Sequence, residues 1–250
     1  MYDTKSQEFS YLLGFFWGDG GIKGGSARIN IIKDDAVKLI HIFEKCLDFD
    51  YREFTPSQKG VIKRKDQSTF RFTKEFKSFL IGYGYLDKSL SSPSKILSVV
   101  DNHCFWRGYF DADGCFYKTK NKAGGRMSFT GDINQDWSDL FDLFKNIGVK
   151  NAKIRKVETQ KGNCSRVELS YGQDILKFGN YIYSDAWFGL ERKKKKFESI
   201  KESLPKSTSK TKGVCYNKAN GYWRAYKKRK HLGWFKTEEE AIKSLNSKAA

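Results

Sequence analysis

Two aromatic-rich segments stand out in the pattern of hydrophobic and polar positions along the chain. Residues 11–20 read YLLGFFWGDG and residues 105–114 read FWRGYFDADG. Both segments end in Asp-Gly, and both carry a glycine five residues before that aspartate. A segment that recurs in this way indicates two copies of one structural unit within the chain.

The same succession of patterns follows each segment. An alternating stretch that predicts paired strands comes first, at residues 21–33 in the first copy and 115–132 in the second. A segment with the helical period comes next, at residues 34–47 and 134–148, and Gly148 stands where a helix C-cap is expected. Further strand-like pieces lie at residues 61–74, 152–160 and 165–172. Closing helices complete each copy, so the predicted order is αββαββα, twice.

Two polar segments without hydrophobic periodicity indicate joints, at residues 87–101 and 204–212. Beyond the second joint, three short strands precede a helix that begins with a capping box, Thr237 with Glu240. We therefore expect a first half (residues 1–90), a second half (residues 91–203), a linker (residues 204–212) and a small C-terminal domain (residues 213–250). The predicted fold class is α+β: two pseudo-symmetric αββαββα halves with antiparallel sheets, followed by a small three-stranded sheet and a helix.

Composition points to the kind of partner. The 250 residues include 47 Lys and Arg against 29 Asp and Glu, which gives a net charge of +18. A surface this basic indicates a polyanionic partner, and nucleic acid is the commonest one. The hydrophobic fraction of 39%, with 16% aromatic residues, is sufficient for a folded core.

The cysteines and histidines give no metal-finger pattern. The five cysteines are scattered without any C-x-x-C spacing, and the three histidines are isolated, so a zinc finger is disfavoured. An odd number of cysteines without a framework fits a reducing compartment. The first residues lack a signal-peptide pattern, and no apolar run approaches the length of a bilayer span. We therefore expect a soluble, intracellular protein without membrane contact.

Small residues recur at helical spacing in both aromatic-rich segments. Gly14 and Gly18 are four residues apart, as are Gly108 and Ala112. At this spacing the small residues share one helix face, which lets two helices approach closely. Close packing would bring together the two terminal aspartates, each at the negative end of its helix dipole. Two carboxylates placed there repel each other, and a bound divalent cation such as Mg²⁺ would relieve that repulsion.

The segments LLGFFWGDG and WRGYFDADG resemble the two LAGLIDADG motifs of the homing endonuclease family. The similarity continues in FTGDINQDWSDLF and SDAWFGLERKKKKFE, and it spans residues 8–203. It implies a monomer whose two motif helices form the interface between the halves. It also implies that each half presents a saddle-shaped antiparallel sheet to the major groove of double-stranded DNA. The family hydrolyses both strands across the minor groove, leaves short 3′ overhangs and uses Mg²⁺.

The resemblance assigns roles to individual positions. The last acidic residue of each motif is the metal ligand, and the backbone of the preceding residue is expected to complete the metal site. Two lysines, one for each half, are expected to polarise the water and phosphate. The predicted catalytic residues are Asp19, Asp113, Lys88 and Lys193, and the predicted metal-binding residues are Asp19, Asp113, Gly18 and Ala112.

The motifs depart from the family pattern at two positions. Trp17 stands where the motif has its earlier acidic residue, which Asp111 keeps in the second copy. Because that position supports the helix pair, we interpret Trp17 as interface packing. Arg107 replaces a small apolar residue, and neither departure removes a metal ligand. Asp34 and Asp132 fall near a polar position that holds site water in relatives.

The predicted strands of both halves interleave basic and polar side chains with apolar ones. If Ile29, Ile31, Phe70 and Phe72 pack inward, the opposite face is polar and can read base edges in a major groove. The predicted DNA-binding residues of the two halves are Lys23, Arg28, Asn30, Lys63, Arg71, Lys118, Lys120, Arg126, Arg155 and Arg166.

The basic C-terminal tail carries a second resemblance. From Gly213-Val214 through Leu232-Gly233 to Ala241, its residues are similar to the apetala/ethylene-response DNA-binding domain of plant regulators, over residues 213–245. That domain lays a three-stranded sheet, backed by a helix, in the major groove. The resemblance implies that Tyr216, Lys218, Trp223, Arg224 and Lys227 face DNA.

The leading hypothesis from the sequence is a site-specific double-strand DNA endonuclease. Two alternatives on the same fold remain open. One is a DNA-binding regulator that does not cut, and the other is an intron maturase that binds RNA on the basic surface. Both motif aspartates are present, which favours the endonuclease.

Overall fold

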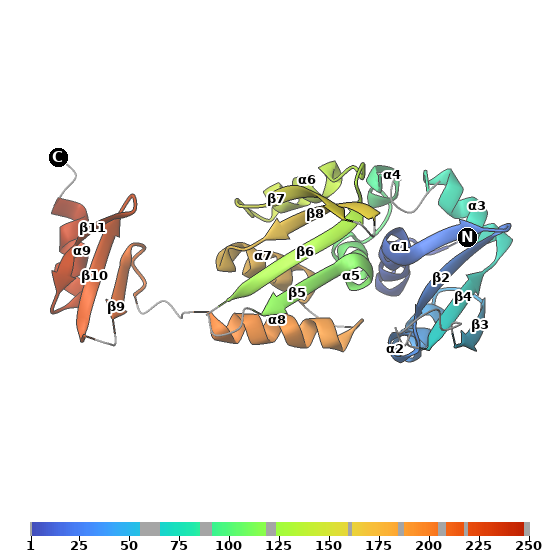
Figure 1. The fold of residues 1–250 in the computed structure, drawn as a ribbon, viewed down its shortest axis with the longest axis horizontal. Helices are drawn as coiled ribbons and strands as arrows, with labels where there is room; N and C mark the ends of the chain where they lie inside the picture. The colour runs from blue at the N-terminus through green and yellow to red at the C-terminus, as the bar shows by residue number, and fades with distance from the viewer. Residues whose placement is uncertain are drawn as a thin grey trace. The chain divides into compact units, whose positions relative to one another are not determined.

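The computed structural model describes residues 2–55, 66–85, 92–118, 124–159, 162–184, 188–204, 209–217 and 220–247, with Lys23 and Thr159 described by their backbones alone. The chain forms two compact units, Met1–Ser203 and Leu204–Ala250. The larger unit contains both copies of the repeated pattern. Figure 1 shows these copies as two sheets on either side of a central pair of helices, α1 and α5.

The first half of the larger unit follows the predicted order of elements. They are α1 (Gln7–Asp19), β1 (Gly20–Lys23), β2 (Ser26–Ile32), α2 (Lys33–Glu44), β3 (Phe49–Phe54), β4 (Gln67–Phe72) and α3 (Lys74–Gly82). The strands form an antiparallel sheet in the order β1-β2-β4-β3. The sequence pattern did not locate β3, an exposed edge strand that is held by Phe49 and Tyr51, whose rings lie 5.1 and 5.2 Å from that of Phe70.

The second half repeats this topology. After a short helix, α4 (Ser94–Leu97), come α5 (Asn102–Asp113), β5 (Gly114–Lys118), β6 (Gly125–Asp132), α6 (Ser138–Asn146), β7 (Lys153–Thr159), β8 (Gly162–Leu169), α7 (Gly172–Ile182) and α8 (Glu191–Ser203). The sheet order is β5-β6-β8-β7, equivalent to that of the first half. Gly148 has a φ of 74° just beyond α6, as its expected place at the helix end requires. The predicted α+β fold class with two αββαββα halves is confirmed.

Each sheet buries one face and leaves the other open. In β2, Ile29 and Ile31 are buried, whereas Arg28 and Asn30, on either side of Ile29, face outward. Ile29 pairs with Phe70 of β4, which is fully buried. The prediction that Ile29, Ile31, Phe70 and Phe72 pack inward is therefore confirmed. The inward face of the second sheet likewise carries the buried residues Phe116, Met127, Phe129 and Val167.

Glycines allow α1 and α5 to pack with their backbones in contact. A Cβ at Gly14 would lie 1.8 Å from the carbonyl oxygen of Phe105, and one at Gly108 would lie 2.0 Å from that of Tyr11. No side chain fits into such spaces, so the close approach of the two helices requires glycine there. Trp17 is buried with its ring 6.0 Å from that of Phe105, which confirms its predicted place in the interface.

The smaller unit is a three-stranded sheet backed by one helix. Its elements are β9 (Val214–Asn217), β10 (Tyr222–Lys227), β11 (Lys230–Phe235) and α9 (Glu238–Ser247), in the sheet order β11-β10-β9. The predicted capping box is present, because the Glu240 amide donates to Thr237 Oγ1 at 3.2 Å and the Thr237 amide donates to Glu240 Oε2 at 3.3 Å. Val214, Ala225 and Ala241 form its buried core. Among the helices described in both units, none is long and apolar enough to cross a membrane.

Candidate active site

The two motif aspartates end two helices that lie side by side. α1 ends at Asp19 and α5 ends at Asp113, and both helices are closed by the amide of the following glycine. A Cβ at Gly18 would lie 2.4 Å from the Cβ of Ala112, so the last turns of the helices touch. Because the glycine contacts run in the same order along both helices, the helices are parallel and both aspartates lie at the same end of the pair.

This arrangement provides oxygen donors suited to a hard divalent cation. Asp19 and Asp113 are half-buried and follow the touching pair Gly18 and Ala112. Carboxylate and carbonyl oxygens are the ligands that Mg²⁺ and Ca²⁺ prefer. The Ala112 carbonyl also accepts a long hydrogen bond of 3.3 Å from Lys193, so that oxygen is shared. The carboxylates of Asp19 and Asp113 therefore fit a divalent metal, and the backbone carbonyls of Gly18 and Ala112 are further oxygen donors.

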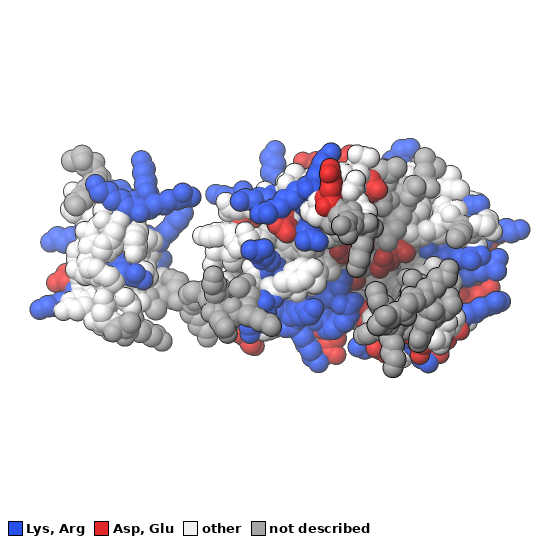
Figure 2. Space-filling model, in the orientation of Figure 1, with Lys and Arg blue, Asp and Glu red and all other residues white. Residues whose placement is uncertain are grey.

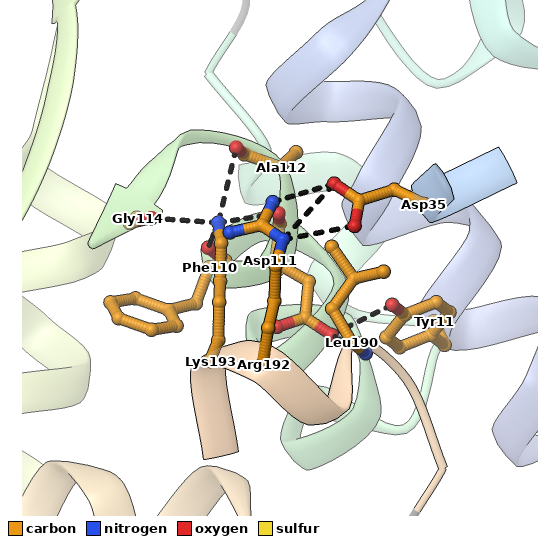
Figure 3. Close-up of polar contacts among 9 residues, drawn as sticks. All are labelled: Tyr11, Asp35, Phe110, Asp111, Ala112, Gly114, Leu190, Arg192 and Lys193. Carbon is orange, nitrogen blue, oxygen red and sulfur yellow. Dashed lines mark hydrogen bonds and ion pairs between the residues drawn. The ribbon is translucent and has the colours of Figure 1, made fainter. Parts of the chain in front are cut away.

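Lys193 lies buried beneath the end of α5. Its Nζ donates to the carbonyl oxygens of Phe110 and Gly114 at 2.8 and 2.7 Å, and also to that of Asp111 (Figure 3). Burial lowers the pKa of Lys193 to about 8, against the opposing charges of Asp111 and Asp19. A cation at this point satisfies carbonyls that the helix leaves without intrahelical partners and complements the negative end of the dipole. Lys193 thus fixes the turn that carries Asp113.

Asp111, the earlier acidic residue of the second motif, bonds to neighbouring parts of the fold. Asp111 is buried, and its Oδ2 accepts hydrogen bonds of 2.8 Å from the Tyr11 hydroxyl and from the Leu190 amide. Burial raises the pKa of Asp111, and the charge of Lys193 opposes that rise. Since Tyr11 belongs to α1, this carboxylate joins the two motif helices. Arg107 is also buried, and its Nε donates to the carbonyl oxygen of Ile182.

A tyrosine near Asp113, and a glutamine bonded to that tyrosine, were not singled out from the sequence. Gln135 donates a hydrogen bond from its amide to the hydroxyl of Tyr109, which faces α1 from α5. Burial, together with the negative charge of Asp113, raises the pKa of Tyr109. Asp132 is the last residue of β6 and Gln135 lies three residues beyond it, so the segment near the position expected to hold site water contributes a neutral amide. No feature of the sequence distinguished Gln135 from its polar neighbours.

The outward face of the first sheet carries the predicted polar side chains. Arg28 of β2 pairs across the sheet with Arg71 of β4, and Asp50 of β3 lies next in that row. In the next row, Thr69 donates a hydrogen bond of 2.6 Å to Asn30 Oδ1. The structure therefore brings Arg28, Asn30 and Arg71 together on one open face.

The outward face of the second sheet carries two arginines that lie close to one glutamate. Arg155 and Arg166 pair across β7 and β8, and Glu168 lies 3.3 Å from Arg155 and 3.9 Å from Arg166. Arg126 shares this face. Lys118 lies on the opposite face of the sheet from Arg126, where it donates a hydrogen bond of 2.9 Å to Ser199 of α8. The structure therefore does not bring Lys118 to the open face. Figure 2 shows basic side chains over both halves, with acidic ones gathered between them in the region of α1 and α5.

The smaller unit divides its predicted DNA-facing residues between two faces. Trp223 packs against the buried core below α9, with the Tyr216 ring 5.2 Å away on the same face. Lys227 donates to the Leu245 carbonyl in α9 at 2.9 Å. Of the DNA-facing residues predicted for the smaller unit, Arg224 is the only one in the described part of the chain that lies on the open face of the sheet. Its guanidinium lies 5.1 Å from the ring of Trp234.

Some predicted site residues lie outside the described part of the chain. They are Lys63, Lys88, Lys120 and Lys218, together with the side chain of Lys23. Their assigned roles remain predictions.

Comparison with known proteins gave one family and several solved structures. The N-terminal LAGLIDADG domain of DUF199/WhiA is 18% identical, covering 74% of this chain and 85% of that one, with a TM-score of 0.47. The homing endonuclease I-WcaI bound to its DNA recognition sequence is 15% identical, covering 78% and 87%, with a TM-score of 0.48. I-DmoI in complex with DNA and Ca is 16% identical, covering 78% and 97%, with a TM-score of 0.44. No curated protein matches the chain. Residues 103–183, which include Asp113, match the family described as LAGLIDADG-like domain.

Proposed function

We propose that this protein is a site-specific, metal-dependent endonuclease that cuts double-stranded DNA, of the homing endonuclease kind. One observation carries the proposal: Asp19 and Asp113 end equivalent helices whose last turns touch at Gly18 and Ala112. Two carboxylates at the negative ends of packed helices are unfavourable for stability alone. A pseudo-symmetric pair of this kind suits the two strands of a duplex, one acidic residue from each half.

The described side chains support a division of labour around the bound phosphates. Asp19 and Asp113, with the carbonyls of Gly18 and Ala112, would hold Mg²⁺. When bound, such a metal lowers the pKa of a water ligand and offsets charge on the phosphate. Lys193 holds the last turn of α5 in place through hydrogen bonds to its carbonyls, so that Asp113 stays oriented. Tyr109 supplies a polar group near Asp113, and Gln135 donates a hydrogen bond to its hydroxyl.

The two open sheet faces supply the contacts that would select a target. Arg28 and Arg71 on the first sheet, and Arg155 and Arg166 on the second, project on the faces away from the core. Arginine forks recognise guanine edges in the major groove, and other basic residues contact phosphates. Two sheets flanking one catalytic pair would span a long site. Cleavage across the minor groove between them would leave short 3′ overhangs.

The smaller unit is proposed to add DNA contacts through its open face. Arg224 lies there with Trp234, Tyr226 and His231, and the adjoining β10–β11 turn carries Arg229. A cation stacked on aromatic rings, beside further basic residues, suits a nucleic-acid surface. We therefore replace Tyr216, Trp223 and Lys227 with this set as the DNA-facing residues of the smaller unit.

A cleavage selection tests the proposal. The purified full chain is incubated with Mg²⁺ and a library of plasmids that carry randomised inserts, and linearised molecules are sequenced. The expected result is enrichment of one long, partly degenerate site with a staggered cut. Specific DNA binding without cutting by folded protein would overturn the endonuclease and favour the regulator. Preferential binding of structured RNA, again without DNA cleavage, would favour the maturase.

A further inference from the structure

An ion pair joins the two halves beside the candidate active site. Arg192, the second residue of α8, donates from Nε to Asp35 Oδ1 at 2.9 Å and from Nη2 to Asp35 Oδ2 at 2.6 Å (Figure 3). Asp35 lies in the first turn of α2, in the first half, and is only 5% exposed. Two parallel hydrogen bonds between a guanidinium and a carboxylate fix orientation as well as distance.

Lys193, the neighbouring residue of α8, bonds to the second half. Lys193 donates to the carbonyls at the end of α5, while Arg192 reaches across to α2 (Figure 3). Two consecutive side chains at the start of α8 therefore connect the two halves. One of them holds the helix that carries Asp113.

Helix α2, which carries Asp35, packs on the helix that ends at Asp19. α2 packs on α1 through Phe43 and Phe15, whose rings lie 6.0 Å apart. α1 in turn ends at Asp19. A continuous path of contacts thus runs from Asp19 through α1 and α2 to the ion pair, and then through α8 and α5 to Asp113.

The glycine contacts bring the backbones of α1 and α5 together, and Trp17 and the hydrogen bond from Tyr11 to Asp111 also join these two helices. Gly14 and Gly108 meet backbone atoms of the opposite helix. The ion pair adds a contact between the halves that is made outside the α1–α5 pair, by α2 and α8. Its position suits a clamp that limits rotation of one half against the other.

We propose that Arg192 and Asp35 are positioning residues that set the separation of Asp19 and Asp113, so that both DNA strands are cut in one encounter. This inference rests on the proposed endonuclease function. If the clamp opens, one half can hold its strand in place while the other half misaligns. A misplacement of about 1 Å costs on the order of 100-fold in the rate of a reaction that depends on alignment.

The test follows both cuts separately on a supercoiled plasmid that carries the selected target. The first cut gives nicked circles and the second gives linear DNA. Arg192→Met is expected to lower the ratio of the second rate constant to the first by roughly 10-fold, so that nicked circles accumulate. The exchanged pair, Asp35→Arg with Arg192→Asp, is expected to restore most of that ratio.

A matched control lies on the same helix. Lys195 pairs with Glu191 at 2.9 Å on the exposed side of α8, and Lys195→Met removes that ion pair while leaving the clamp intact. This variant is expected to keep the wild-type ratio. A merely destabilising effect of Arg192→Met would lower both rate constants together and would not be rescued by the exchanged pair.

A second measurement needs neither metal nor cleavage. Spin labels on encoded residues at Val37 and Tyr171, each 56% exposed and one in each half, report the distance between the halves in metal-free protein. Arg192→Met is expected to broaden that distance distribution, and the exchanged pair to narrow it. An unchanged distribution with an unchanged cutting ratio would overturn the clamp. Absence of cutting by the wild type would overturn the endonuclease alone, because the distance measurement would still test the clamp.

Discussion

The hydroxyl of Tyr11 in α1 donates a hydrogen bond of 2.8 Å to Asp111 Oδ2 in α5. Both side chains are buried, so the earlier acidic residue of one motif serves as a polar link to the other motif helix. Tyr11→Phe leaves this buried carboxylate with one donor fewer. We expect a loss of about 1–3 kcal/mol in the free energy of unfolding, measured by denaturant titration. Tyr171→Phe, at a position 56% exposed, serves as the control and is expected to change little.

The contact between helix backbones gives a second prediction. Gly108→Ala places a Cβ 2.0 Å from the Tyr11 carbonyl oxygen, so the helices must separate. The expected loss of stability is about 1–3 kcal/mol or more, as for other overpacked cores, together with loss of cutting. Gly21→Ala is the matched control, because a Cβ there meets nothing within 4 Å. Equal thermal midpoints for the two variants would contradict the packing described for α1 and α5.

The open face of the smaller unit gives a third prediction. Arg224→Ala removes the guanidinium that lies 5.1 Å from Trp234 and is expected to weaken target binding by about 10-fold. The control is Lys243→Ala, which removes an exposed lysine of α9 on the other side of the sheet. Fluorescence anisotropy with labelled target DNA at several salt concentrations measures both. A larger effect for Lys243→Ala would place the DNA contact on the helix side.

Two thiols are expected to be unreactive in the folded protein. Burial raises the pKa of Cys46 and that of Cys104 to about 12. At pH 8 the thiolate fraction would then be on the order of one in ten thousand, and only the thiolate reacts. Because the pKa values of Cys46 and Cys104 are raised in the folded state, the free energy of unfolding is expected to fall as pH rises above the ordinary thiol pKa. Mass spectrometry after iodoacetamide treatment tests this expectation: alkylation in native protein as fast as in urea would contradict it.

The sequence predicted the fold and the central pair of aspartates because both depend on local pattern. The repeated segments located α1 and α5, and small residues four apart indicated their close approach. Alternation in β2 and β4 correctly divided inward from outward side chains. Each of these features follows from a period along one element, which a single sequence contains.

Contacts between distant elements could not be predicted in this way. The pairing of Asp35 with Arg192 depends on the rotation of α2 and α8, which no pattern along one element contains, and Asp35 was not singled out from the sequence. In the smaller unit, a strand pattern does not say which face the helix covers. Ala225 shares a face with Trp223, and its small side chain beneath α9 was the one signal for that face.

The most direct test of the central claim is strand-resolved cleavage of the selected target by wild type, Asp19→Asn and Asp113→Asn, with Mg²⁺. Each substitution keeps the shape of the side chain and removes its charge, and circular dichroism checks that the variants fold. Both variants are expected to lose cutting of both strands by several orders of magnitude while retaining specific binding. Wild-type cutting by either variant would contradict the claim that the two helix-end carboxylates form one catalytic site.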